Sequence, residues 1–272
     1  MILKLLFLFF LYIEIINCQN YDEELTKTAV NISQASYCVS KTNVWNCATC
    51  DKNNIYENSS LINGEFAIYG YNNLYDSIFV GFRGSSNLEN WVTNIHFSII
   101  YPYGNDIGIE KGFYTLFDSF KNEAYININL LSNKYKTNNI IITGHSLGGA
   151  ISTLLNFDIL YNNLPYKTNL ITFGSPRVGN QNFVNEFNKY NTYSKRITHY
   201  FDMVPHVPQE FLHYQHITNE IWFNSDNRQY KICDDLYEED KSCSNSCAPT
   251  HCTSIDDHLY YMNISMGSGG DC

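Results

Sequence analysis

Residues 140–150 read IIITGHSLGGA, and this stretch decides the fold. Its isoleucines predict a buried strand and the residues after them predict a helix, so the backbone must reverse sharply between the two. The turn contains Gly-x-Ser-x-Gly with Ser146 in the middle. In this setting the motif is typical of a nucleophile elbow, in which the helix N-terminus behind the serine can stabilise an oxyanion. The alternative is a glycine-rich turn with an idle serine.

On both sides of this turn the pattern alternates between strands and helices. Strands are predicted over 65–71, 76–82, 139–143, 169–173 and 196–201, and helices over 24–37, 112–135, 148–161 and 180–190. Such alternation predicts a mostly parallel sheet flanked by helices, which is the α/β class. No repeat, low-complexity linker or proline-rich hinge divides residues 19–272, so a single domain is expected there.

The composition is that of an acidic globular protein. Hydrophobic residues make up 44% of the 272 and aromatic residues 15%, which excludes a disordered chain. The formal net charge is −10. Neutralising nucleic-acid phosphates requires lysine and arginine, so we expect no nucleic-acid partner.

The first residues resemble a secretory leader. Residues 5–13, LLFLFFLYI, form an apolar run that is too short to span a bilayer and fits a signal peptide. Cleavage is expected after Cys18, which removes residues 1–18; an uncleaved signal anchor is the alternative. No later stretch is long enough for a transmembrane segment. The protein is therefore expected to be secreted or to reside in the lumen of a secretory or digestive compartment.

The cysteine count supports this location. Of nine cysteines, eight remain without Cys18, and an even number suits full pairing in an oxidising compartment. The Cys47-x-x-Cys50 spacing also occurs in redox and zinc sites, but it has no good second pair, so we favour disulfides and expect no metal. Asn31, Asn58 and Asn263 begin glycosylation sequons.

A nucleophilic serine needs a base, and a third group must orient that base. In enzymes with this elbow, the acid and then the histidine follow the serine along the chain. Asp202 is the favoured acid because it directly follows the predicted strand 196–201, at the end where parallel strands open onto a crevice. Asp226 is the alternative.

Five histidines follow Asp202, and spacing alone leaves the choice of base open. His258 is favoured because it lies close to the C-terminus, where a loop can carry it over the sheet. The others are His206, His213, His216 and His251.

Five segments together resemble a known family. They are FRGSS at 82–86 followed by Trp91, GHSLGGA at 144–150, FGSPRVG at 173–179, DMVPHVP at 202–208 and DHLYY at 257–261. With these motifs in this order, the chain resembles the class 3 lipases. These are secreted α/β-hydrolases that include fungal triacylglycerol lipases and feruloyl esterases. The resemblance covers nearly all of residues 19–272. Ser175 and a cysteine-rich insertion before His258 depart from the family pattern.

The resemblance implies a site and a cross-linking pattern. The catalytic triad would be Ser146, Asp202 and His258, with Ser85 and the Leu147 amide forming the oxyanion hole. Neither a metal nor an organic cofactor is expected, and the protein would be a monomer. The implied disulfides are Cys38–Cys272, Cys47–Cys50 and Cys233–Cys243, which leaves Cys247 to pair with Cys252.

Residues 86–97 predict an amphipathic helix. Its apolar stripe is Leu88, Trp91, Val92 and Ile95, and Ser86 and Glu89 have the spacing of a capping box. Taken alone, the stripe fits a helix packed on the core. The resemblance implies instead a helical lid over the active site that opens at a lipid surface.

These expectations describe a secreted serine hydrolase that cleaves carboxylic esters of lipids at a lipid–water interface. The alternatives are an esterase acting on soluble or cell-wall esters, like the feruloyl esterases, and a phospholipase A1. A non-enzyme alternative is an inactive pseudo-hydrolase that binds lipid or a partner.

Overall fold

The computed structural model describes residues 21–38, 45–85, 87, 97–104, 106–190, 192–234, 239–248, 250–267 and 272. The predicted signal peptide, residues 1–18, lies outside these ranges. So does the predicted lid stripe, Leu88, Trp91, Val92 and Ile95.

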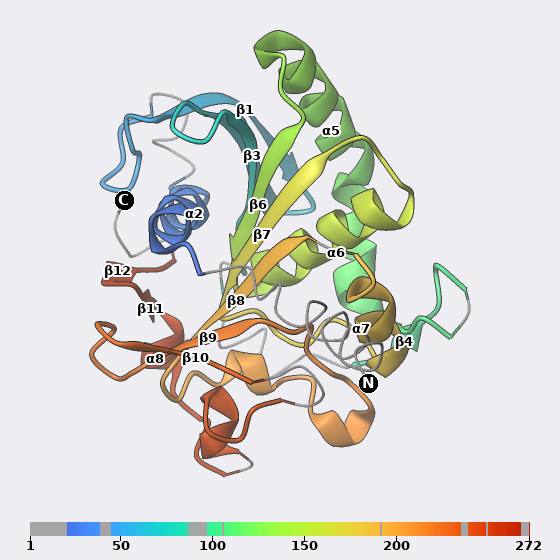
Figure 1. Ribbon diagram of the computed structural model, residues 1–272, viewed down its shortest axis with the longest axis vertical. Coiled ribbons are helices and arrows are strands. Elements are labelled where there is room, and N and C mark those ends of the chain that lie inside the picture. Colours follow the sequence, from blue (N-terminus) through green and yellow to red (C-terminus); the bar gives the residue numbers. More distant parts are fainter. Residues whose placement is uncertain are drawn as a thin grey trace, which may run out of the picture.

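An eight-stranded sheet forms the centre of the fold, in the order β1-β2-β3-β6-β7-β8-β9-β10 (Figure 1). The strands β3, β6, β7, β8 and β9 run parallel, and β1, β2 and β10 pair antiparallel at the edges. The predicted α/β class with a mostly parallel sheet is therefore confirmed. The strands are β1 (Asn54–Ile62), β2 (Glu65–Asn72), β3 (Ser77–Phe82), β6 (Asn139–His145), β7 (Lys167–Phe173), β8 (Tyr193–His199), β9 (Glu220–Phe223) and β10 (Tyr230–Ile232).

Helices cover both faces of the sheet. In Figure 1, α2 lies on one side and α5, α6 and α7 lie on the other. Two buried clusters match this arrangement, because alternate residues of β6 point to opposite faces: Ile140 and Ile142 pack towards α5 and α6, and Ile141 packs towards α2. The helices are α2 (Glu23–Ala35), α5 (Lys111–Tyr135), α6 (Leu147–Tyr161) and α7 (Gln181–Phe187).

Short elements complete the fold. Two small hairpins pair β4 (Ile99–Ile100) with β5 (Ile109–Glu110) and β11 (Tyr260–Tyr261) with β12 (Ile264–Ser265). A one-turn helix, α8 (Ile255–His258), precedes β11. The 3-10 turns are Val204–His206, Glu210–Leu212 and Ser244–Cys247. Within the described ranges, no helix combines the length and the apolar character that crossing a membrane requires.

The predicted glycosylation sites differ in exposure. Asn58 in β1 and Asn263 in the turn before β12 are exposed. Asn31 is half-buried in α2, and Ser33 of its sequon is buried with its hydroxyl 2.8 Å from the Thr143 hydroxyl. Modification of these asparagines stays a prediction.

Four disulfides join the eight cysteines of residues 19–272. The pairs are Cys38–Cys272, Cys47–Cys50, Cys233–Cys243 and Cys247–Cys252, which is the pairing that the family resemblance implies.

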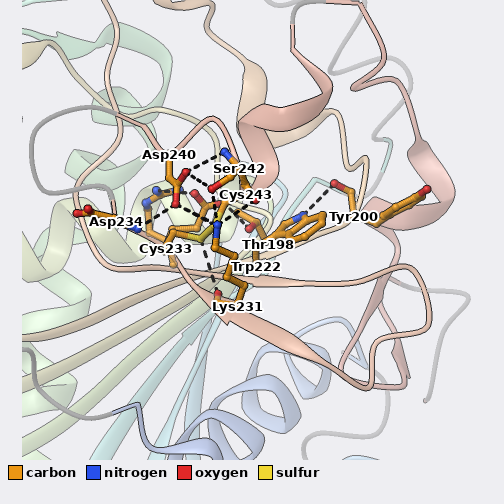
Figure 2. The surroundings of a disulfide bond; sticks show 11 residues. Thr198, Tyr200, Trp222, Lys231, Cys233, Asp234, Asp240, Ser242 and Cys243 are labelled. Atoms are coloured by element: carbon orange, nitrogen blue, oxygen red, sulfur yellow. Dashed lines mark hydrogen bonds and ion pairs between the residues drawn. A yellow bond between two sulfur atoms is a disulfide. The ribbon is translucent and has the colours of Figure 1, made fainter.

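Figure 2 shows the surroundings of the Cys233–Cys243 disulfide. Lys231 of β10 reaches towards the loop that the disulfide closes: its Nζ lies 3.5 Å from Asp240 Oδ2 and 3.3 Å from the Ser242 carbonyl oxygen. Burial raises the pKa of Asp240, but hydrogen bonds from Ser242 outweigh this effect, and the pKa falls to about 2. These contacts fasten the cysteine-rich segment, from Cys233 to Cys252, to the edge of the sheet.

Removing the Cys38–Cys272 disulfide is expected to lower the free energy of unfolding by about 5 kcal/mol, because cross-links that close long loops most restrict the unfolded chain. The two cysteines are 234 positions apart. Guanidinium titration of Cys38→Ser/Cys272→Ser measures the loss. The matched control is Cys47→Ser/Cys50→Ser, whose loop spans 3 positions and whose loss should be about 1.5 kcal/mol. Equal losses would contradict this account.

Candidate active site

Ser146 lies at the sharp turn between β6 and α6. Its backbone has φ 59° and ψ −130°, a conformation rarely adopted by residues other than glycine, and its amide donates to the Phe173 carbonyl at 2.9 Å. The flanking glycines make the turn possible. A Cβ at Gly144 would lie 2.3 Å from the Gly148 carbonyl oxygen, and one at Gly148 would lie 2.1 Å from the Phe82 carbonyl oxygen. The local structure is therefore the strained elbow that the motif predicts.

The structure brings Asp202 and His258 together. Asp202 follows β8, and His258 is the last residue of α8. His258 Nδ1 lies 2.9 Å from Asp202 Oδ1 and 2.8 Å from Oδ2, with 0% and 1% of the two residues exposed. A carboxylate only accepts hydrogen bonds, so Nδ1 carries the proton and Nε2 is left free to take one.

The backbone fixes where this pair sits. Asp202 forms a parallel bridge with Ser254, whose side chain caps α8 by accepting from the Asp257 amide at 3.0 Å. The position of α8, and hence of His258, is therefore set by the same segment that carries Asp202.

Two further donors hold the Asp202 carboxylate. The Val204 amide donates to Oδ1 at 2.8 Å, and the Tyr261 hydroxyl donates to Oδ2. Burial, and then the charge of Asp202, raise the pKa of Tyr261 well above its usual 10, so this hydroxyl stays protonated. The segment DHLYY includes Tyr261, but the sequence assigned it no role because nothing in the local pattern shows its contact with Asp202.

Ser146 adjoins the Asp202–His258 pair through β7. Its amide bonds to Phe173, and the next residue, Gly174, packs so tightly against the pair that a Cβ there would lie 2.7 Å from Asp202 Oδ2 and 2.9 Å from His258 Cε1. Within the part of the chain that the structure describes, Ser146 Oγ and His258 Nε2 are both buried without a hydrogen-bond partner. In the reaction a proton would pass between these two atoms. In enzymes, the distance between a nucleophile and its base commonly shortens to that of a hydrogen bond only when substrate binds.

The two predicted oxyanion-hole residues, Ser85 and Leu147, lie at the same edge of the sheet. β3 and β6 are parallel neighbours with Phe82 opposite Gly144, so Ser85 and Leu147 both follow the carboxyl ends of these strands. Leu147 is the first residue of α6, where backbone amides are free of helical partners. Ser85 is half-buried, and its Oγ accepts from the Asn87 amide at 3.3 Å.

The alternative acid and bases lie elsewhere. Asp226 is exposed and accepts from the Arg228 amide at 3.0 Å. Among the histidines that the structure describes, His258 is the one whose ring contacts Asp202. The remaining candidates are His206, whose Nε2 lies 3.8 Å from Cys247 Sγ, His216, whose Nε2 lies 2.7 Å from the Pro205 carbonyl oxygen, and the exposed His213 and His251.

Among the residues that the structure describes, two groups of side chains have the spacing of metal ligands. They are His206 with Cys247 and Cys252, and Glu220 with Cys233 and Cys243. In both, the two sulfur atoms are joined in a disulfide, so neither group can supply the thiolates that soft metal ions require.

A cavity of about 890 Å³ borders the loop that follows Asp202. Met203, Val207 and Phe211 line it from this loop, and Ala248 and Cys252 line it from the cysteine-rich segment. Its volume and partly apolar lining are those of pockets that bind small organic ligands.

Comparison with known proteins gives matches over most of the chain. Residues 79–212 match the family described as lipase (class 3). A lipase of Rhizopus niveus is 31% identical over 257 residues, covering 90% of this chain and 64% of that protein, so the chain spans just under two thirds of this relative. The solved structure of lipase II from Rhizopus niveus gives a TM-score of 0.82 at 30% identity and covers 90% of this chain and 96% of that one. A second structure, of a triacylglycerol lipase with a serine-protease triad as its catalytic centre, gives a TM-score of 0.82 at 29% identity, with the same coverage.

Proposed function

Since the chain belongs to the class 3 lipase family, with its α/β-hydrolase fold, we propose that it is an enzyme that hydrolyses carboxylic esters of lipids. Ser146 is the nucleophile, His258 the base and Asp202 the group that orients it. The observation that carries the proposal is the buried contact of His258 Nδ1 with both Asp202 oxygens, at 2.9 and 2.8 Å, next to a serine on an elbow.

The reaction runs in two halves. Ser146 Oγ attacks the ester carbonyl as its proton passes to His258 Nε2, and the imidazolium that forms is stabilised by Asp202. The negative charge on the former carbonyl oxygen is held by the Leu147 amide and the Ser85 hydroxyl. The alcohol leaves with the proton from His258, and an acyl ester remains on Ser146. Water then attacks this ester as its proton passes to His258 Nε2. His258 returns the proton to Ser146 Oγ, and the fatty acid is released.

Secretion is part of the proposal. Residues 1–18 are the signal peptide, and residues 19–272 form the single domain. Four disulfides hold the domain, which suits an oxidising compartment outside the cytosol. The exposed sequon at Asn263 is open to glycosylation in that compartment. At the exposed Asn58, the side-chain amide donates to Asn127 Oδ1 at 2.7 Å and Ser60 of the sequon is buried.

The initial rate on a triacylglycerol, raised in concentration through its solubility limit, tests the substrate class. We expect a jump in rate when droplets form, because the apolar stripe predicted in residues 86–97 favours opening at a lipid surface. Ser146→Ala, measured alongside, supplies the blank. A rate that saturates below the solubility limit and does not change when droplets form would indicate an esterase for soluble esters. It would also reject the prediction that residues 86–97 form a lid. Activity confined to phospholipid vesicles would mean a phospholipase A1.

A further inference from the structure

His145, the residue between Gly144 and Ser146, has a side chain that the mechanism above does not use. It is 1% exposed and points to the face of the sheet that α2 covers. The alternation along β6 places it there: Ile141 packs into the cluster below α2, and the Thr143 hydroxyl lies 2.8 Å from Ser33 of α2. His145 is the next β6 residue on this face, and its ring contacts Tyr37, which follows α2.

Both ring nitrogens of His145 are occupied. Nε2 lies 2.8 Å from the backbone carbonyl oxygen of His258, and Nδ1 lies 2.8 Å from the Tyr37 hydroxyl. A carbonyl oxygen can only accept, so Nε2 carries the proton and donates it. Burial, and then repulsion from His258, hold the pKa of His145 well below 6.5, so the ring is neutral and Nδ1 accepts from Tyr37. A single tautomer satisfies both contacts.

The contacts of Tyr37 reach the other side of the site. Burial raises the pKa of Tyr37 well above 10, so its hydroxyl keeps its proton for His145. Gly84 packs against the same oxygen, since a Cβ at Gly84 would lie 2.2 Å from it. Gly84 directly precedes Ser85. A continuous path therefore runs from the oxyanion segment through Tyr37 and His145 to the backbone of His258.

The end of this path is a group that needs a partner. His258 is the last residue of α8, which is only four residues long, and carbonyls at a helix C-terminus have no intrahelical donor. The rings of His145 and His258 are 4.4 Å apart between centroids. The position of the His258 backbone, and with it the reach of Nε2 towards Ser146, thus depends on a donor from the elbow itself.

We propose that His145 is a positioning residue: its Nε2–H anchors the His258 carbonyl so that the His258 ring meets Ser146, and Tyr37 couples this anchor to the oxyanion segment. The inference rests on the proposed hydrolase function. It differs from a purely structural role because loss of the Nε2 contact lowers turnover strongly, whereas loss of the Nδ1 contact with Tyr37 lowers it only a few-fold.

Two amide substitutions separate the contacts. The amide of Gln places a donor where His Nε2 lies, and the amide of Asn places an acceptor where Nδ1 lies. His145→Gln is expected to keep kcat within about 3-fold of wild type, whereas His145→Asn lowers kcat by about 10- to 100-fold with KM within about 2-fold, as a misplaced catalytic group does. Both are measured on a soluble p-nitrophenyl ester, with thermal unfolding recorded for each. His213→Asn, at an exposed histidine, is the matched control.

The possible outcomes either support or overturn the proposal. Equal losses of kcat in the Gln and Asn variants, following their unfolding temperatures, would overturn the proposal, as would an Asn variant with wild-type kcat. If neither variant folds, Tyr37→Phe removes just the hydroxyl and should lower kcat by about 3- to 10-fold at constant KM; an unchanged kcat would overturn the proposal. A wild-type protein that neither cleaves the ester nor reacts with a fluorophosphonate fails the proposed function itself, which is a different result.

Discussion

Replacing Ser146 with alanine is expected to lower kcat on a soluble ester by about 10⁴- to 10⁶-fold while the protein remains folded. The reason is chemical: without Oγ no acyl-enzyme can form, and only the oxyanion donors and binding remain. The hydroxyl has no hydrogen-bond partner within the described part of the chain, so its removal leaves no donor or acceptor unsatisfied. The measurement is kcat, together with labelling by a fluorophosphonate, which should fail in the variant.

Ser152→Ala is the matched control for this substitution. Ser152 lies on α6, the helix that Ser146 precedes, and its buried hydroxyl likewise has no partner among the described residues. We expect wild-type rates and normal labelling from it. A Ser146→Ala protein that keeps more than a tenth of wild-type activity would show that Ser146 is not the nucleophile and that the turn is only structural. A wild-type protein that fails to label would favour the pseudo-hydrolase.

Replacing Asp202 with asparagine is expected to lower kcat by about 10⁴-fold, with little change in the fold. The Val204 amide donates to Oδ1 and the Tyr261 hydroxyl to Oδ2. An asparagine can keep the bond from Val204 through its one oxygen, while its NH₂ group takes the place of Oδ2 and the Tyr261 hydroxyl can rotate to accept from it. The NH₂ group would then face His258 and favour the tautomer with the proton on Nε2. That tautomer cannot take the proton of Ser146.

The pH dependence of kcat and circular dichroism spectra accompany this measurement. Asp226→Asn, at the exposed alternative acid, is the control and should keep wild-type kcat. Comparable losses in both variants would reject Asp202 as the orienting acid, and a fully active Asp202→Asn would do so at once.

The sequence predicted the centre of the fold better than its edges. The central strands and the helices around them are long and periodic, and the helix predicted over 112–135 differs from α5 (Lys111–Tyr135) by one residue. Strand β1 was missed because NIYENSSLI mixes exposed and half-buried positions and lacks a clear apolar face. The Asn63-Gly64 turn after it, with φ of 53° and 82°, was an available hairpin signal. The short strands β9 and β10, at one end of the strand order, carry too few residues to show a period.

Some residues of the candidate site could be predicted from the sequence and others could not. Ser146, Asp202 and His258 stand in motifs whose order is readable along the chain. The contacts of Tyr37 with His145 and of Tyr261 with Asp202 are not, because they join residues 108 and 59 positions apart. Such pairs arise from the packing of α2 and the C-terminal hairpin on the sheet. No local pattern encodes them.

The Cys38–Cys272 disulfide has a mechanical consequence. Its two Cα atoms are 5.4 Å apart, yet 234 positions of chain separate them, and all eight strands of the sheet lie in that interval. A tensile force applied to the chain at these two residues passes through one covalent bond and loads neither the sheet nor Ser146, Asp202 and His258. Reducing the bond would allow the chain between the two cysteines to extend to a contour length of roughly 800 Å. The domain is thus shielded from stretching for as long as the bond stays oxidised.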